Sequence, residues 1–151
     1  MSSHTGEGHG FRTLQRADIE TFPDAFVAIA ADQPGEYWTK AHFMRDLPGK
    51  WSLSFAVWSD GLPIAYAILS AKGMGHAHLH HFMVASTHRG SGLGARMAAE
   101  MERRVLDGRF SRLTLKAVRD NARSLGFYER LGYRRLADEG DYAVLEKRLT
   151  P

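Results

Sequence analysis

A glycine-rich segment at residues 88–95, HRGSGLGA, has a spacing that could bind phosphate. It lies between a predicted strand and a predicted amphipathic helix. Glycines at positions 90, 92 and 94 remove the side chains that would keep a bulky anion from the backbone, and a helix N-terminus presents N–H groups without partners in the helix. The segment therefore predicts a turn that binds phosphate oxygens. A tight turn without a ligand is the alternative.

Two well-known phosphate loops fit this segment less well. A Walker loop ends in Gly-Lys-Ser/Thr, whereas Gly94 is followed by Ala95 and Arg96. Residues 90–95 satisfy the loose dinucleotide pattern G-x-G-x-x-G/A, with Asp120 in the place of a ribose ligand. Residues 95–151 are too short, however, for the repeated parallel units that a dinucleotide spans.

Four histidines in HAHLHHFMV, residues 76–84, form the second group that could do chemistry. An imidazole has a pKa of about 6.5 and can accept a proton near neutral pH. Side chains alternate along a strand, so we expect one face with His76, His78, His80, Phe82 and Val84 and the other with Leu79, His81 and Met83, unless a bulge shifts the register. The alternatives are half-buried histidines held by hydrogen bonds, or zinc ligands.

Hydrophobic periodicity predicts the elements that position these residues. Strands are expected at residues 11–14, 53–58, 63–69, 77–85, 113–118, 133–136 and 142–149, and helices at 18–31, 36–46, 91 to about 105, and 121–131. Leu93, Met97, Met101 and Val105 recur every four residues, which predicts a helix that packs by one side. The result is an α+β fold with a mixed, mostly antiparallel sheet of about seven strands and about four helices.

The composition is that of an ordinary globular protein. Of the 151 residues, 44% are hydrophobic and 25% are charged, so we expect a mobile lead at residues 1–10 and a single domain at 11–151. The lack of cysteine excludes disulfides, a thiolate nucleophile and cysteine-ligated metal centres. No apolar run approaches the roughly 20 residues that cross a bilayer, and no signal-peptide core is present, so we expect a cytoplasmic protein.

Positive charge is concentrated in the second part of the chain. Residues 1–88 carry six basic and eight acidic side chains, whereas residues 89–151 carry 14 and nine. Fifteen of the 20 basic residues are arginine, whose planar guanidinium suits phosphate. The excess fits a phosphorylated ligand, although a solvated basic surface explains it as well.

The chain resembles the GNAT family of acyl-CoA-dependent N-acetyltransferases in three segments. Residues 89–94, RGSGLG, meet the family's acyl-CoA signature Arg/Gln-x-x-Gly-x-Gly/Ala. In NARSLGFYERLGY, Asn121, Tyr128 and the pair Gly132-Tyr133 match a second family element. The ending YAVLEKRL resembles the family's closing strand, and the order of predicted elements agrees along nearly the whole chain from Phe11.

The resemblance implies a GNAT fold whose sheet is splayed at a central acyl-CoA cleft. The pantetheine arm would pair there with backbone groups of Phe82, Met83 and Val84, and Asn121 would contact the cofactor. The pyrophosphate would be held by the turn of Arg89, Gly90, Ser91, Gly92, Leu93, Gly94 and Ala95. Tyr128 would lie beside the sulfur and protonate the departing thiolate. A phenol that merely packs is the alternative for Tyr128.

The stretch AHLH, residues 77–80, resembles the branch of the family that acetylates arylalkylamines such as serotonin. In that branch two strand histidines act as base through ordered water, and His78 and His80 occupy their positions. The family's acceptor usually lies against the first two helices and the loop between the last strands. Here those segments contain aromatic and acidic residues suited to an apolar or aromatic amine with positive charge: Tyr37, Trp38, Phe43, Trp51, Asp138, Glu139 and Asp141.

These observations predict an N-acetyltransferase that moves the acetyl group of acetyl-CoA to an amine, most simply a small molecule. The amine would attack directly in a ternary complex, while backbone N–H groups near Met83 polarise the thioester carbonyl. We expect no metal, no nucleic acid and no membrane as partners, and a homodimer is compatible with the sequence. The alternatives are a non-catalytic acyl-CoA-binding or sensor module and a metal-dependent enzyme that uses the strand histidines.

Overall fold

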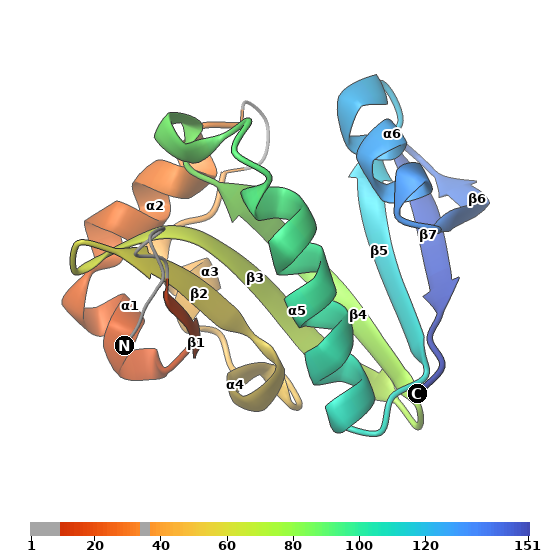
Figure 1. Ribbon diagram of the computed structural model, residues 1–151, viewed down its shortest axis with the longest axis horizontal. Helices are drawn as coiled ribbons and strands as arrows, with labels where there is room; N and C mark the ends of the chain where they lie inside the picture. The colour runs from red at the N-terminus through yellow and green to blue at the C-terminus, as the bar shows by residue number, and fades with distance from the viewer. Residues whose placement is uncertain (1–9, 34–36) are drawn as a thin grey trace.

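The computed structural model describes residues 10–33 and 37–151, which form one seven-stranded sheet with helices on both faces (Figure 1). The strands are β1 (Gly10–Thr13), β2 (Phe55–Ser59), β3 (Leu62–Gly73), β4 (His76–Val84), β5 (Arg112–Val118), β6 (Arg134–Glu139) and β7 (Tyr142–Arg148). The helices are α1 (Arg16–Thr21), α2 (Pro23–Ala31), α3 (Lys40–Met44), α4 (Lys50–Leu53), α5 (Leu93–Asp107) and α6 (Ala122–Arg130), with a 3-10 turn η1 (Ser86–His88). The expected lead at residues 1–10 lies outside the described residues, apart from Gly10 in β1.

The strands lie in the order β1-β2-β3-β4-β5-β7-β6, and all neighbours are antiparallel except β4 and β5. α5 lies between β4 and β5 in the chain, because parallel neighbours require a crossover connection. The expected α+β class with a mixed, mostly antiparallel sheet is confirmed.

The parallel pair opens along its length. Residues 76–79 of β4 pair with residues 112–115 of β5, and within the described part of the chain no later residue of β4 pairs with β5. Residues 82–84 stay paired with β3. The two halves of the sheet therefore diverge beyond Leu79, as the V between β4 and β5 in Figure 1 shows. This confirms the expected splay at the centre of the sheet.

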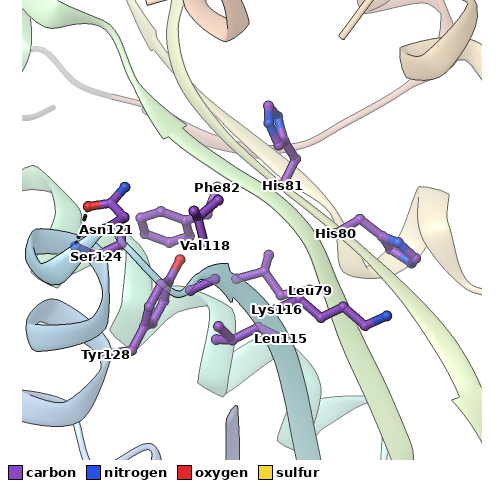
Figure 2. Close-up of a pocket in the computed structure, with 11 residues that line it drawn as sticks. Leu79, His80, His81, Phe82, Leu115, Lys116, Val118, Asn121, Ser124 and Tyr128 are labelled. Carbon is purple, nitrogen blue, oxygen red and sulfur yellow. Dashed lines mark hydrogen bonds between the residues drawn. The ribbon is translucent and has the colours of Figure 1, made fainter. Parts of the chain in front are cut away.

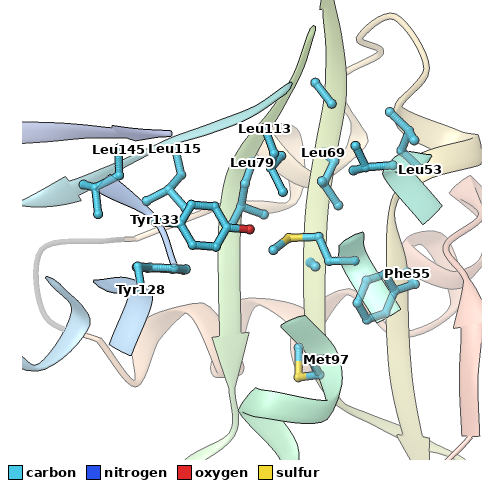
Figure 3. Close-up of a cluster of buried hydrophobic side chains, with 14 of the residues drawn as sticks. Leu53, Phe55, Leu69, Leu79, Met97, Leu113, Leu115, Tyr128, Tyr133 and Leu145 are labelled. Atoms are coloured by element: carbon cyan, nitrogen blue, oxygen red, sulfur yellow. The ribbon is translucent and has the colours of Figure 1, made fainter. Parts of the chain in front are cut away.

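Each face of the sheet has its own hydrophobic cluster. The cluster under α1, α2 and α3 contains Ile19, Phe26, Phe43, Tyr66 and Ile68. The cluster under α5 and α6 contains residues of α5, of the sheet and of α6, among them Leu79, Met97, Leu115, Leu145 and Tyr128 (Figure 3). Because successive side chains of β3 point to opposite faces, this strand supplies both clusters.

α5 carries the apolar stripe that the sequence predicts. Leu93, Met97, Met101 and Val105 are all buried against the sheet. Each such side chain contributes about 1.5–3 kcal/mol relative to an exposed one. The stripe therefore fixes the first turn of α5, and with it the glycine-rich turn that precedes the helix.

A polar cluster joins α5 to the other half of the sheet. Glu102 on α5 accepts hydrogen bonds from the Tyr133 hydroxyl at 3.1 Å and from Lys147 Nζ at 3.0 Å. Burial and the neighbouring Glu102 carboxylate raise the pKa of Tyr133 above its ordinary value, so its hydroxyl stays protonated. The cluster ties β7 and the end of α6 to α5 and so limits how far the two halves can separate.

The helices differ from the sequence prediction in number and boundaries. The single helix expected at 18–31 is two helices, because Pro23 has no N–H group and occupies the first position of α2. The helix expected at 36–46 is α3, which begins at Lys40 after a capping box formed by Thr39 and His42; Glu36 lies outside the described residues. α4 was not expected, and together these changes give six helices within the described residues instead of about four. Two strands are also longer than expected: β3 continues to Gly73 and β6 to Glu139.

None of the helices among the described residues has an apolar stretch long enough to cross a membrane.

Candidate active site

The glycine-rich turn connects the open end of β4 to α5. After η1, Gly90 and Gly92 adopt left-handed backbone angles, with φ of 78° and 81°, and Gly92 is the residue before the first turn of α5. A side chain at either position would be strained. Arg89 anchors the turn, because its Nε donates to the Val84 carbonyl at 3.0 Å, and the Ser91 hydroxyl donates to the His88 carbonyl at 2.8 Å.

Two adjoining cavities lie beside this turn. One of about 210 Å³ is lined by Val84, His88, Arg89, Gly90, Gly94, Ala95, Arg123 and Phe127. The other, of about 320 Å³, is lined by Gln33, Phe82, Met83, Val84, Arg89, Gly94, Asn121, Arg123, Ser124, Phe127 and Tyr128. Two arginines and the N-terminus of α5 give this region positive potential. An added Cβ on Gly90 or Gly92 would meet no protein atom within 4 Å, so both glycines border open space and the residues present fit a pyrophosphate group.

The opening between the splayed strands forms a third cavity of about 50 Å³ (Figure 2). Residues 79–82 of β4 and 115–118 of β5 line its sides, together with Asn121, Ser124 and Tyr128 of the α6 segment. Tyr128 is 8% exposed, and its hydroxyl points from α6 toward the gap between the strands (Figure 2). Asn121 caps α6, since its Oδ1 accepts from the Ser124 N–H at 3.1 Å.

A β-bulge in β4 changes the faces of the histidine strand. The register places Ile68 opposite His81 and Leu69 opposite Leu79, so His80 is an extra residue. His80 and His81 consequently line the same cavity, on the face away from α5. Phe82 and Val84 pack instead on the α5 face. The expectation that Phe82 and Val84 share a face with His80, and that His81 lies with Leu79, is therefore wrong, as the bulge shifts the register; His81 does share its face with Met83.

The strand histidines are linked to hydroxyl groups. His80 Nε2 lies 2.6 Å from Ser70 Oγ, and the His78 and His80 rings are 4.9 Å apart. His78 Nδ1 and His76 Nε2 both bond the Thr114 hydroxyl, at 2.8 and 2.7 Å. His81 Nδ1 bonds the Tyr66 hydroxyl at 2.7 Å, and its ring stacks on Trp38 at 4.6 Å. A hydrogen-bonded chain thus runs from His78 through Thr114 to His76.

Burial keeps these histidines neutral. It lowers the pKa of His78 to about 3, with His80 and Lys72 as further causes. It lowers the pKa of His80 to about 4, where Lys72, Arg45 and Lys50 add to the effect. Both imidazoles are therefore uncharged at neutral pH and can accept a hydrogen bond, and the same burial makes them weaker bases than a solvated histidine.

A fourth cavity, of about 420 Å³, lies on this histidine face. Its lining residues are Tyr37, Trp38, Lys72, His78, Leu79, His80, His81, Lys116 and Tyr142. It shares Leu79, His80, His81 and Lys116 with the opening between the strands, and that opening shares Phe82, Asn121, Ser124 and Tyr128 with the larger cavity beside the turn. The opening therefore lies between a cavity on each face of the sheet.

The structure brings together most of the residues singled out from the sequence. Tyr128, His78 and His80, the residues 82–84, Asn121 and Arg89, Gly90, Gly94 and Ala95 line these connected cavities. Leu93 does not, because its side chain is 1% exposed in the core below the turn. Ser91 bonds within the turn, and Gly92 shapes it.

The expected acceptor residues are only partly in place. Tyr37 and Trp38 line the histidine-face cavity, but Phe43 is fully buried and Trp51 Nε1 donates to Asp46 at 2.8 Å. None of the three acidic residues expected across the sheet, Asp138, Glu139 and Asp141, lines that cavity. Aromatic residues at helical spacing often serve the core, and here two of four do not reach the cavity.

Sequence reasoning missed Lys72, Lys116, Arg123 and Phe127. The predicted end of the strand at Leu69 left Lys72 in a turn, whereas β3 extends through it. Arg123 and Phe127 follow Asn121 in the first turns of α6, so a basic residue beside the second family element was the available signal.

No group of three or more His, Cys, Asp or Glu side chains that could hold a metal ion occurs within residues 10–33 and 37–151. The strand histidines bond Ser70 and Thr114 instead.

Comparison with solved structures shows a shared fold at low sequence identity. Ard1 from Thermoplasma volcanium has a TM-score of 0.82 and 18% identity, with 95% of this chain and 99% of that chain covered. The ribosomal-protein-S18-alanine N-acetyltransferase from Escherichia coli has a TM-score of 0.80 and 17% identity, with 95% of each chain covered. PaiA N-acetyltransferase from Thermoplasma acidophilum, in complex with coenzyme A, has a TM-score of 0.75 and 18% identity, with 93% and 98% covered.

No curated protein matches the sequence significantly. The model of the acetyltransferase (GNAT) family matches residues 7–133, which include the glycine-rich turn, the histidine strand and Tyr128. Because this match covers most of the chain and the fold agrees with it, the chain belongs to the GNAT family of acetyltransferases.

Proposed function

We propose that this protein transfers the acetyl group of acetyl-CoA to the amino group of an acceptor, by direct attack in a ternary complex. The observation that carries the proposal is the opening between β4 and β5, which lies between a cavity bordered by the glycine-rich turn and a cavity bordered by histidines. A donor and an acceptor that enter from opposite faces can meet there without a covalent enzyme intermediate.

Acetyl-CoA supplies an activated thioester when it is bound on the α5 face. The N–H groups of the turn at residues 89–95 would hold its pyrophosphate, with Arg89 and Arg123 as neighbouring cations. Backbone groups of residues 82–84 would pair with the pantetheine arm, because β4 has no partner strand on its β5 side there. An N–H group near Met83 would polarise the thioester carbonyl. Asn121 caps α6 and lines the cavity where the arm would lie.

The acceptor would enter on the histidine face. An amine nitrogen becomes acidic as it gives its electron pair to the carbonyl carbon, so a neutral imidazole can take the proton that the nitrogen loses. His80 lines both the opening and the histidine-face cavity, and His78 lies beside it. The hydrogen bonds from His78 to Thr114 and on to His76 would carry away a proton that His78 takes, whereas His80 bonds Ser70.

Tyr128 is the group we assign to the departing thiolate. Its hydroxyl points into the opening on the opposite side of β4 from His80 (Figure 2). The ring is held by packing on Phe82, Phe127 and Tyr133, at centroid distances of 6.3, 5.1 and 5.6 Å. A phenol fixed in this way can donate its proton to sulfur while the base acts from the other face.

Calorimetry with CoA and acetyl-CoA, followed by thiol-release assays with a panel of amines, tests the proposal. We expect heat with both coenzymes and thiol release with at least one amine. Heat without thiol release for any amine would favour the non-catalytic acyl-CoA-binding module. No heat from folded protein would remove the proposal.

A further inference from the structure

Among the residues that the structure describes, those that line the histidine-face cavity include two lysines and no carboxylate. Lys72 comes from the end of β3 and Lys116 from the middle of β5, so they approach the cavity from neighbours on either side of β4. Lys116 and His80 lie on the same side of the opening in Figure 2. A cavity that carries two ammonium groups is suited to a negatively charged group.

Of the two lysines, Lys72 is the more available to a ligand. Its side chain is exposed, and within residues 10–33 and 37–151 it makes no ion pair with an acidic group. Lys116 pairs with Glu139 at 2.8 Å, but the side chains are 48% and 57% exposed. Solvent screens such a surface pair, so an incoming anion can compete with Glu139 for Lys116.

The charges that act on the histidines are also cationic. Lys72, Arg45 and Lys50 act on His80, and Lys72 and Lys116 act on His78. Of the acidic residues near the last hairpin, Glu139 offsets Lys116 in part, whereas Asp138 bonds Arg135 at 2.8 Å and lies 3.6 Å from Arg119. The cavity as a whole is therefore positive beside neutral imidazoles.

We propose that the acceptor is an amine that also carries an anionic group, which Lys72 and Lys116 bind while the amino group lies at His80. This inference rests on the proposed acetyltransferase function and narrows its substrate class. It replaces the expectation of an arylalkylamine with positive charge only, because an acceptor without an anion would face the unpaired charge of Lys72 beside Lys116, whose pair with Glu139 is exposed.

Acceptors that share one structure but differ in charge test the proposed anion site directly. Tryptophan, tryptamine and tryptophanamide share the same indole group. The amino group of tryptophanamide is less basic than that of tryptophan, so this compound controls for amine basicity. Phosphoethanolamine and ethanolamine form a second set that distinguishes a phosphate from a carboxylate. We expect kcat/KM to be at least about tenfold higher for the anionic member of one or both sets, the size of one charge-assisted contact. If kcat/KM for tryptamine and ethanolamine equalled or exceeded that for their anionic counterparts, the inference would be overturned.

Variants of the lysines test whether the preference for an anionic acceptor depends on Lys72 and Lys116. Lys72→Met should reduce the preference for the anionic acceptor about tenfold, and Lys116→Met less, because Glu139 already occupies Lys116 in part. Lys72→Glu should reverse the preference toward tryptamine. Lys40→Gln, an exposed lysine of α3 outside the cavity lining, is the matched control and should change nothing. A preference that survives Lys72→Glu would contradict the assignment.

A binding measurement separates this inference from the proposed function. N-acetyltryptophan and N-acetyltryptamine are titrated into wild type and Lys72→Glu by calorimetry, without acetyl-CoA or turnover. Tighter binding of N-acetyltryptophan to wild type, lost in the variant, supports the anion site even if no amine is acetylated. Acetyl transfer without this difference in binding would rule out the anion site and leave the proposed transferase function standing.

Discussion

Beside the β4–β5 opening, the cavities on the two faces of the sheet are lined by differently distributed parts of the chain. On the α5 face, one continuous stretch, residues 84–95, supplies most of the residues that line the small cavity, two of them glycines. On the histidine face, the lining comes from residues 37–38, 72, 78–81, 116 and 142, and side chains define it. Backbone donors leave glycine as their only mark in a sequence, whereas the histidine face leaves its histidines but no sign of the residues that other strands bring to it. The first face can therefore be recognised from a motif, and the second can differ freely among chains of the same fold.

The largest expected effect concerns Tyr128, the proposed acid on the α5 face. Tyr128→Phe should lower kcat about a hundredfold and leave the KM for acetyl-CoA unchanged, since it removes one proton donor and little packing. Tyr133→Phe is the control, because its hydroxyl bonds Glu102 in the core and should affect thermal stability only. Steady-state kinetics on both variants measure kcat and the KM for acetyl-CoA. Undiminished turnover in Tyr128→Phe would mean that the phenol only packs.

The next effect tests the backbone site. Gly92→Ala places a Cβ at φ 81° where the pyrophosphate is proposed to bind, and we expect the KM for acetyl-CoA to rise about tenfold. Gly140→Ala, at φ 58° in the β6–β7 turn, carries a similar strain of about 1–2 kcal/mol far from the turn at residue 90. Both variants should lose thermal stability. A rise in KM shared by both would assign the effect to folding rather than to the turn.

On the histidine face, His80→Gln should lower kcat about tenfold without changing the KM for acetyl-CoA. Ser70→Ala keeps the imidazole but removes the hydroxyl that lies 2.6 Å from it, so its effect should be about two- to threefold. Single-turnover kinetics at saturating acetyl-CoA separate this chemistry from binding. If Ser70→Ala were the more damaging, the hydroxyl and not the imidazole would be the important group.

The smallest effect is a pH dependence of stability. His78 and His80 have folded-state pKa values of about 3 and about 4, below the ordinary value of 6.5. Between pH 6.5 and 4 the unfolded chain binds more protons than the folded one, so stability is present above pH 6.5 and declines as the pH falls. Thermal melts should show a shallower decline in His78→Gln and His80→Gln than in wild type.

Local patterns predicted the elements well where one signal dominated. The four-residue spacing of Leu93 to Val105 predicted α5, and Asn121 predicted the start of α6. Boundaries failed where local signals competed. Pro23 allowed a second helix start inside an apolar pattern, and the Ala-rich run of β3 continued past Leu69 because its partner β4 was there to pair with it.

The sequence by itself determined the phosphate-binding turn, the tyrosine and the histidines as candidates, because glycine spacing, helix caps and strand alternation are properties of neighbouring residues. Only the tertiary structure decided which of them meet. The bulge at His80 depends on the pairing of β4 with β3, and the opening at Tyr128 depends on β4 and β5 parting after Leu79. The approach of Lys72 and Lys116 likewise joins residues from two strands that flank β4. Strand register and contacts between distant segments are set by the packing of the whole core, and no local pattern encodes them.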